Sequence, residues 1–455
     1  MKITQSLLAA ALVLTPLCGL STTQVSAKTI SITKYGAKGN DKKDDTKAIQ
    51  KALDANKNGT VTIPKGTYYS QVLYLRGNTT LKLAKGAVMK KLAFKKHPED
   101  AWVIFHPKKK GYNGFKKVTI TGGIWDGQVH KNNKTSEHKG FELDHGQNVT
   151  ITNTTLKNMS GLHMIEVNAC KNVKINHVTF MNQYFYSGKN HSSVAKYTTQ
   201  TCEALQFDSA TKGAAEALPL DGTICQNYTI TNNTFKNVQS GLGSHHNESK
   251  YWKHMHKNIV VKNNTFSSLK GDAIHMNNIN GATIQNNTCT SGGQLFLTLY
   301  HSTNMKVSQN KASGFRTALA MIQGTTATIA NDSYTSPVDS TSPAFNVFMD
   351  HATATISHTT IDAKVKGNVV ANNGSNLTLS GCTLSNTKYH GKYGFVANAA
   401  GTVNITGCNF AGNGSLYAMV LKGGNFTVTN NTATDYQAFL INKGNNTIKE
   451  SNNNV

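Results

Sequence analysis

The sequence predicts an all-β solenoid, in which short strands wind into stacked coils. A strand–turn phrase recurs along the chain, for example at residues 172–176, 227–231 and 425–429. Most steps between copies are 20 to 31 residues long, and no helical periodicity accompanies them. This spacing is typical of a β-solenoid. The last inward aliphatic residues of the copies are Ile120, Ile151, Ile175, Ile230, Val261, Ile284, Val307, Ile329, Ile356, Leu379, Ile405, Val428 and Ile448.

The chain is predicted to begin with a secretory signal peptide at residues 1–27. Lys2 precedes an apolar run, and Ala27 closes a small-residue cleavage site. We therefore expect the protein outside the cell. No later stretch is long and apolar enough to span a membrane. Residues 28–455 are expected to form one β-helix domain, with an N-terminal strand and helix at 28–70, site-bearing coils at 118–310 and C-terminal coils at 311–455.

An amphipathic helix is predicted close to the mature N-terminus. Asp44 and Asp45 are typical N-cap residues. They precede an apolar stripe at helical spacing, made of Ala48, Ile49, Ala52 and Leu53. We expect this helix to cap the solenoid, where open strand edges invite aggregation.

This region resembles the N-terminal signature of the pectate-lyase superfamily. The residues that carry the resemblance are 35–39 (YGAKG), 44–49 (DDTKAI) and 61–68 (VTIPKGTY). The resemblance implies a single-stranded right-handed parallel β-helix. Members of the superfamily include hydrolases, lyases, epimerases and phage tailspikes, so the fold alone does not settle the chemistry.

The chain is strongly basic, with 47 Lys and Arg against 23 Asp and Glu and a formal net charge of +24. A secreted protein of this charge is attracted to polyanions, such as acidic polysaccharide or an anionic cell surface. We expect no nucleic-acid partner, because the lysines are scattered and no nucleic-acid module is visible. The protein is expected to be a monomer that binds a polysaccharide. Its positive charge is expected to hold it on the cell wall.

Cysteines and asparagines support the repeat architecture. Cys202 and Cys225 bracket a long loop and are the expected disulfide. Cys382 and Cys408 follow matching motifs, so we expect them to stack in adjacent coils. Asn-Asn-Thr phrases at 232–234, 263–265 and 286–288 are interpreted as turn chemistry, since asparagine tolerates the left-handed conformation.

Polar side chains are expected to line one outward face over five successive coils. Alternate residues of a strand face opposite sides, so the aligned strands give two outward columns. Insertions at 209–224 and 247–257 leave the coils at this face and are expected to wall a groove. The first column is Glu142, Glu166, Gln206, Gly243 and Ala273, and the second is Asp144, Asn168, Asp208, His245 and His275.

These columns provide the groups that glycoside hydrolysis requires, an acid and a base. Glu166 and Asp208 are one coil apart and two positions offset, which places their backbones about 8 Å apart. That spacing suits an inverting mechanism. The predicted catalytic residues are Asp208, Glu166, His245 and His275. The predicted substrate-binding residues are Glu142, Asp144, Asn168, Gln206, His246, Trp252 and Tyr300.

The site also resembles that of the polygalacturonases in part. Gln206-Phe207-Asp208 is similar to their Asn-x-Asp element, and His245 lies in the coil of their Gly-His-Gly element. The resemblance implies that Asp208 is a catalytic carboxylate and His245 its supporting histidine. The chain lacks the paired Asp-Asp of that family, and Arg316-Thr317-Ala318 differs from its Arg-x-Lys clamp.

Three functions remain open on the sequence. The first is a glycosidase of polygalacturonase-like type. The second is a polyuronate lyase or epimerase, with His245, His275 or Tyr300 as the base. The third is a non-catalytic wall-binding protein. No cofactor is expected, and no metal site, because the histidines lack zinc-motif spacing.

Overall fold

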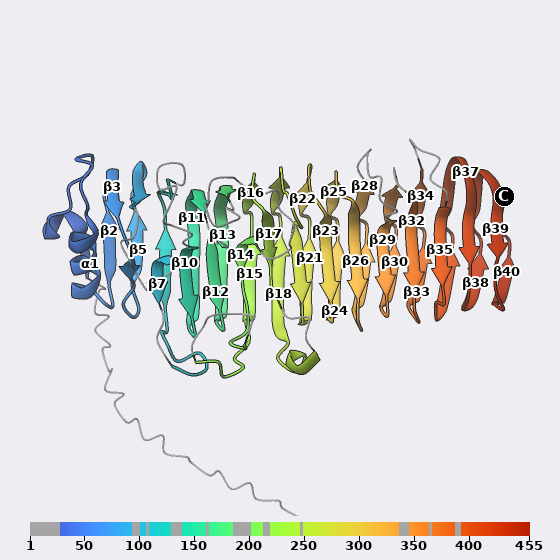
Figure 1. Ribbon diagram of the computed structural model, residues 1–455, viewed down its shortest axis with the longest axis horizontal. Helices are drawn as coiled ribbons and strands as arrows, with labels where there is room; N and C mark the ends of the chain where they lie inside the picture. Colours follow the sequence, from blue (N-terminus) through green and yellow to red (C-terminus); the bar gives the residue numbers. More distant parts are fainter. Residues whose placement is uncertain are drawn as a thin grey trace, which may run out of the picture.

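The computed structural model describes residues 28–92, 101–105, 109–128, 139–160, 163–184, 202–212, 219–245, 249–335, 345–363, 366–386 and 393–455. Over these residues the chain is an elongated solenoid of parallel strands, which confirms the predicted fold class (Figure 1). The predicted signal peptide and His246 lie outside the described residues. The strands stack coil upon coil in three ladders.

The first ladder holds the repeated phrase. Its inward aliphatics pair in register from Ile120 through Val428, as the period predicts. The prediction for Ile448 is wrong, because this residue pairs with Phe426. The strands are β1 (Thr29–Ser31), β2 (Thr60–Ile63), β5 (Thr80–Leu83), β8 (Val118–Thr121), β11 (Gln147–Ser160), β13 (Lys171–Tyr184), β15 (Gln226–Thr231), β18 (His256–Lys262), β21 (Ile279–Gln285), β24 (Thr303–Ser308), β27 (Thr326–Ala330), β30 (Thr353–Ser357), β33 (Asn376–Ser380), β36 (Thr402–Thr406), β38 (Asn425–Thr429) and β40 (Thr447–Ser451).

The second ladder follows the first after a sharp turn. Its core contains stacked rings, with Phe235 4.6 Å from Phe180 and 4.8 Å from Phe266 between centroids. It includes the C-terminal parts of β11 and β13. Its other strands are β3 (Gly66–Ser70), β6 (Ala87–Lys91), β9 (Ile124–Asp126), β16 (Thr234–Lys236), β19 (Thr265–Ser267), β22 (Thr288–Cys289), β25 (Lys311–Ser313), β28 (Ser333–Thr335), β31 (Thr360–Asp362), β34 (Thr383–Ser385), β37 (Asn409–Leu421) and β39 (Thr432–Asn442).

The turn between these ladders has the predicted asparagine chemistry. Asn232 and Asn263 adopt the left-handed conformation, each with φ of 57°. The next asparagine in each phrase is buried and bonds to the coil above. Asn233 Nδ2 donates to Asn264 Oδ1 at 3.0 Å, and Asn264 Nδ2 donates to Asn287 Oδ1 at 3.0 Å. These amides satisfy one another inside the turn, where unpaired polar groups are costly.

The third ladder bears the polar face and is called the site ladder below. It is completed by the C-terminal parts of β37 and β39, which turn without a break from the second ladder. Its other strands are β4 (Leu73–Tyr74), β7 (Ala101–Phe105), β10 (Lys139–Asp144), β12 (Ile165–Asn168), β14 (Glu203–Gln206), β17 (Ser240–Gly243), β20 (Ile274–Asn277), β23 (Leu295–Tyr300), β26 (Thr317–Ile322), β29 (Phe345–Asp350), β32 (Gly367–Asn372) and β35 (Tyr393–Asn398).

Helical structure is confined to short segments of the described chain. The helix α1 (Thr46–Ala55) lies at the N-terminal end of the solenoid (Figure 1). Its residues Ile49 and Leu53 are buried in the main core, as the apolar stripe predicts. That α1 caps the strand edges stays a prediction. Two single 3-10 turns, η1 (Ile32–Tyr35) and η2 (Ser249–Tyr251), complete the helical elements.

The expected disulfide between Cys202 and Cys225 is absent, because both residues are free thiols. Cys202 immediately precedes β14 of the site ladder, whereas Cys225 precedes β15 of the first ladder. Cys225 instead donates to the Asp208 carbonyl oxygen at 3.2 Å. Cys382 and Cys408 precede residues paired in adjacent strands, so they stack as predicted.

Candidate functional site

The outward face of the site ladder carries three polar rows, which run along the solenoid axis. The strand pairings place each member of a row beside the corresponding residue of the next coil. The first row is Lys139, His163, Glu203, Ser240 and Asp272. The second row is Glu142, Glu166, Gln206, Gly243 and His275. The third row is Asp144, Asn168, Asp208, His245 and Asn277.

The predicted columns are correct over four coils and wrong in the fifth. Gly243 pairs with His275, so His275 belongs to the second row and not beside His245. Asn277 follows His245 in the third row, and its strand is fixed there by Ser244, whose hydroxyl donates to the Asn277 carbonyl oxygen at 3.0 Å. Ala273 leaves the first predicted column for the same reason.

The whole first row escaped the sequence prediction. Each of its ionisable members lies three residues before a member of the second row, as Glu203 lies before Gln206 and Asp272 before His275. Strict alternation assigns residues three positions apart to opposite faces, so period-two reasoning does not reach them. The signal in the sequence by which this row can be found is the recurring spacing of three residues between polar side chains.

Glu203 and Asp208 flank the imidazole of His245. The ring nitrogen Nδ1 lies 2.8 Å from Asp208 Oδ2, and Nε2 lies 3.2 Å from Glu203 Oε2. Both carboxylates are fully buried, whereas 19% of the His245 side chain is exposed. The cluster therefore reaches the surface through the histidine.

The protonation states in this group follow from its charges. Burial lowers the pKa of His245, but Glu203 and Asp208 outweigh it and raise the pKa well above its usual value. Burial raises the pKa of Asp208, but the charge and hydrogen bonds of His245 bring it down to about 2. The same imidazolium lowers the pKa of Glu203 against its burial. At neutral pH His245 is therefore a cation between two carboxylates.

Lys139 and His163 hold the N-terminal side of the cluster. Lys139 Nζ lies 3.3 Å from Glu142 Oε2 and 3.0 Å from Glu166 Oε2. His163 Nε2 lies 3.6 Å from Glu166 Oε1. Burial lowers the pKa of His163 to about 4, so its ring is neutral at pH 7. Glu166 is thus engaged in an ion pair within the cluster.

Asn168 and Gln206, predicted to bind substrate, brace the cluster from within. Asn168 Oδ1 accepts from the Asp208 backbone at 2.9 Å, and its Nδ2 donates to Glu166 Oε2 at 3.3 Å. The Gln206 amide donates to Asp208. Asp144 is fully buried, and Glu142 is 1% exposed. Those side chains position the charged groups rather than lining open space.

His275 and Asp272 form the C-terminal side. His275 Nδ1 lies 3.8 Å from Asp272 Oδ2 and 4.0 Å from Glu203 Oε1. Burial lowers the pKa of His275, so this ring is neutral at pH 7, unlike His245. Burial also raises the pKa of Asp272 to about 7. Thr298 donates to the Asp272 carboxyl at 3.3 Å.

The raised pKa of Asp272 makes the free energy of unfolding decrease as pH rises. Its carboxyl ionises near pH 3.8 when unfolded and near 7 when folded, so folding is favoured less as pH rises through this window. The full cost above pH 7 is about 4 kcal/mol. We expect Asp272→Asn to raise the free energy of unfolding at pH 8, by up to that amount, and to change it little at pH 4.

Urea denaturation at both pH values measures this difference. The exposed Asp435→Asn is the matched control, and we expect no change from it. An Asp272→Asn variant that loses stability equally at pH 4 and pH 8 would contradict the raised pKa.

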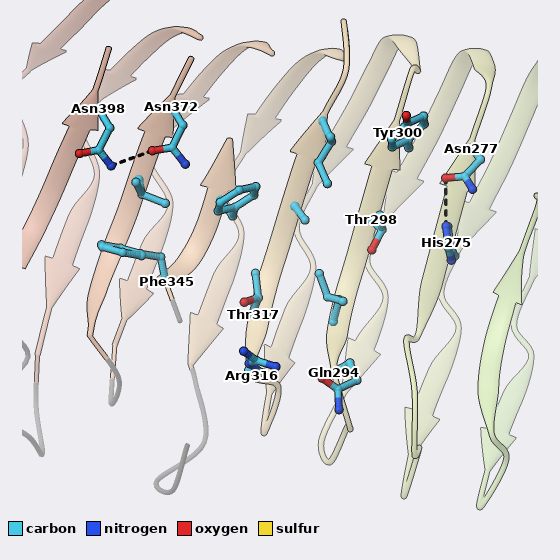
Figure 2. Close-up of a pocket in the computed structure, with 15 residues that line it drawn as sticks. His275, Asn277, Gln294, Thr298, Tyr300, Arg316, Thr317, Phe345, Asn372 and Asn398 are labelled. Carbon is cyan, nitrogen blue, oxygen red and sulfur yellow. Dashed lines mark hydrogen bonds between the residues drawn. The ribbon is translucent and has the colours of Figure 1, made fainter. Parts of the chain in front are cut away.

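A cavity of ≈ 580 Å³ opens beside His275 and continues along the site ladder (Figure 2). Tyr300 lines it, as predicted for a substrate-binding residue. Trp252 does not: its ring stacks on His301 with centroids 3.9 Å apart and an angle of 14°. The lining residues are His275, Asn277, Gln294, Leu295, Thr298, Tyr300, Arg316, Thr317, Ala320, Ile322, Phe345, Phe348, Val370, Asn372 and Asn398.

Loops from three coils interlock at the third-row edge of this face. His145, just after β10, donates from Nδ1 to the Gly111 carbonyl oxygen at 2.9 Å, and Gly111 N donates to Asp221 at 2.7 Å. His254 donates to the Gly222 carbonyl oxygen at 2.9 Å. Gly222 has φ of +80°, and a Cβ there would lie 2.3 Å from the His254 ring. The described parts of the inserted loops are thus tied to one another at this edge, and that they wall a groove stays a prediction.

The charged rows are not needed to build the fold. In later coils the second row continues as Ala320, Phe348, Val370 and Val396, on the same ladder. Burying ion pairs is frequently less favourable than burying apolar groups of similar size. A buried cluster with strongly shifted pKa values, beside a cavity, is instead typical of a functional site.

The described residues show neither a metal centre nor a membrane helix. Within them, no three His, Cys, Asp or Glu side chains gather in a way that would hold a metal ion. The helices described there are also too short and polar to cross a bilayer.

Fold and site together define a parallel β-helix protein with a buried charged cluster and an adjoining cavity on one ladder. A family model described as rhamnogalacturonase A/epimerase, pectate lyase-like, matches residues 29–258, which is half of the chain. The protein belongs to this family. A second model, for a right-handed β-helix region, matches residues 223–388, so the handedness implied by the sequence resemblance is confirmed.

Two curated relatives match part of the chain. Plasmin and fibronectin-binding protein A of Streptococcus pneumoniae (strain ATCC BAA-255 / R6) is 28% identical over 267 residues, which are 53% of this chain and 36% of that protein. Exo-poly-alpha-D-galacturonosidase of Dickeya chrysanthemi is 41% identical over 70 residues, 15% of this chain and 12% of that protein. The chain therefore spans about a third of the first relative and about an eighth of the second.

Solved structures share the fold. The S. pneumoniae surface protein and adhesin PfbA has a TM-score of 0.54 at 19% identity, covering 93% of this chain and 100% of that chain. A mutant tailspike protein of E. coli bacteriophage HK620, in complex with a hexasaccharide, has a TM-score of 0.57 at 12% identity, covering 93% and 80%. At such identities the likeness concerns the fold alone.

Proposed function

We propose that this protein is an extracellular enzyme that hydrolyses glycosidic bonds of a polysaccharide at the charged cluster. One observation carries the proposal. Two histidines lie on either side of the buried carboxylate Glu203, with ring centroids 6.5 Å apart, and one is held protonated while the other is held neutral. Glycosidic cleavage requires this combination of a proton donor and a proton acceptor.

The roles follow from exposure and protonation. His245 is the most exposed of the charged groups. Its Nδ1 is held by Asp208 at 2.8 Å, so we assign to the Nε2 proton, which faces Glu203 at 3.2 Å, the transfer to the glycosidic oxygen as the bond to the anomeric carbon breaks. The neutral His275, which lines the cavity, takes a proton from the water that attacks that carbon. An aspartate lies behind each ring, Asp208 at 2.8 Å and Asp272 at 3.8 Å. Glu203 and Glu166 act through neighbours as positioning residues.

The net charge of the chain and the names of its relatives support a class of substrate. The net charge of +24 favours a polyanion. The family model is named for a rhamnogalacturonase and an epimerase, and one relative is named an exo-poly-alpha-D-galacturonosidase. We therefore propose a uronate-containing polysaccharide, cleaved outside the cell by a monomer that the anionic cell surface retains.

The first experiment is a product assay on polygalacturonate and rhamnogalacturonan. Hydrolysis releases new reducing ends without the ultraviolet absorbance of an unsaturated uronate. We expect that outcome, and we expect it to disappear in Asp208→Asn. Reducing ends that appear together with the absorbance would overturn hydrolysis in favour of elimination by the same acid–base pair.

A specific observation favours a second function. The longest curated match is to a plasmin and fibronectin-binding protein, so the chain is also a candidate adhesin without catalysis. In that case polysaccharide or host protein would bind, no product would form, and neutralising His245 would leave the binding unchanged.

A further inference from the structure

The cavity changes character as it leaves the charged cluster. Near β20 it is lined by His275 and Asn277. Farther along, its floor is formed by Ala320, Phe348 and Val370. Of the described residues that line it, Arg316 and His275 are the basic ones and no acidic residue is among them, and Arg316 lies at the first-row edge (Figure 2). The apolar arm is defined here as Ile322, Phe345, Phe348 and Val370, with Asn372 and Asn398 at its third-row edge.

We propose that the apolar arm binds uncharged sugar units of the polysaccharide, those whose carboxyl group is absent or esterified. This inference rests on the proposed function, because it assigns a second specificity to the same groove. The uronate units belong toward the charged cluster, where the His245 imidazolium is the cation that reaches the surface. The apolar arm then selects a substrate in which neutral units adjoin charged ones.

Desolvation supports the choice of an uncharged occupant. Two cations lie on the first-row side of this surface, Arg316 and Lys366, whose Nζ is 5.8 Å from the Phe345 ring centroid. A carboxylate placed farther in, against Phe348 and Val370, would lose water without gaining a partner, and that loss is costly. The apolar ring face of a pyranose packs instead on partly exposed aromatic rings, without such a cost. Phe345 and Phe348 are both partly buried and rest on the outer apolar cluster that contains Val370 and Val396.

Gly367 gives Phe345 the room to lie along this face. It pairs with Phe345 in the next coil, and a Cβ on Gly367 would lie 2.7 Å from Phe345 Cε1. The opposite edge is polar, since Asn398 Nδ2 donates to Asn372 Oδ1 at 2.8 Å. Amide groups have further donors and acceptors for sugar hydroxyls. The apolar arm therefore pairs an aromatic surface with an amide edge.

The length of the cavity favours a sugar chain over a single small molecule. Its lining runs from β20 to β35 on consecutive coils of the site ladder. With coils about 4.8 Å apart, this distance is about 24 Å. Because His275 and Asn277 line the same cavity, an occupant of the apolar arm is continuous with the bond cleaved at the cluster.

Binding to two chemically matched probes tests the proposal. The probes are polygalacturonate oligosaccharides and their fully methyl-esterified forms, measured by calorimetry with the full chain carrying Asp208→Asn, which is expected to abolish cleavage and keeps His245 beside Glu203. We expect Phe345→Ala to weaken binding of the esterified probe about tenfold, and to change binding of the acidic probe less than twofold. Tyr417→Ala is the control, because Tyr417 belongs to the same outer apolar cluster but does not line the cavity.

Other outcomes overturn the inference. If Phe345→Ala weakened binding of both probes equally, the apolar arm would hold charged units as well. The same conclusion would follow if Arg316→Gln weakened binding of the acidic probe alone and Phe345→Ala weakened neither. Phe345→Leu, which keeps apolar volume, guards against misfolding and should lose a smaller factor. Failure of the proposed function looks different: no product forms from either polymer, while the selectivity between the probes persists.

Discussion

His245→Gln is expected to lower the rate of polysaccharide cleavage by about 10²–10⁴-fold, because it removes the protonated imidazole from the cluster. The neutral amide cannot replace an acid whose pKa Asp208 and Glu203 hold high. Reducing-end release from polygalacturonate measures the effect. The matched control is His177→Gln, an exposed histidine of β13, for which we expect an unchanged rate.

The same substitution destabilises the fold. It leaves the buried Asp208 and Glu203 without their cation, and an uncompensated buried charge costs about 3–5 kcal/mol. The variant must therefore be assayed under conditions where circular dichroism shows it folded. His245→Lys separates the two effects, since it keeps a positive charge and loses the imidazole proton donor. A His245→Lys enzyme with full activity would contradict the role given to His245.

The fold was predictable because its signal is redundant. A shift of one residue in the register of a strand would turn its apolar side chains toward solvent. Twelve inward aliphatic residues, one in each of twelve strands, agree on the same register and exclude such a shift. The final coil is the instructive error. Its last step is shorter than the others, so Ile448 was matched to Val428 although it pairs with Phe426. A shift of two residues keeps every side chain on its face, and alternation cannot detect it.

The candidate site was predictable only in part, for the same physical reason. Placing His275 beside His245 preserves the alternation, and the true register is distinguished by the pairing of Gly243 with His275 and by the contact between Ser244 and Asn277. Glu203 lies three residues before Gln206 in the same strand, so alternation assigns it to the opposite face, although it contacts both histidines. Burial, which drives the pKa shifts of His163, His275 and Asp272, depends on packing that no sequence period records.

Glu203→Gln distinguishes a functional cluster from a structural one. In the group formed by Glu203, Asp208 and His245, two negative charges surround one positive charge. Removing the Glu203 charge leaves a balanced pair between Asp208 and His245, so we expect a stability loss well below the 3–5 kcal/mol of a broken buried pair. We nevertheless expect the cleavage rate to fall, because loss of the Glu203 charge lowers the pKa of the proton donor His245.

The pH profile reports that change directly. Glu203 raises the pKa of His245, and a neighbouring opposite charge typically contributes one to three units. In Glu203→Gln the pKa of His245 falls, so the alkaline limb of the rate profile moves about 1–3 pH units lower, with Glu450→Gln, an exposed glutamate, as the control. A profile that keeps its alkaline limb while the urea midpoint drops would mean that Glu203 serves only stability. The Glu203 charge is costly to bury, and Asp208 alone would balance the charge of His245. We therefore expect the pH–rate profile to shift, because the remaining role of Glu203 is to raise the pKa of His245.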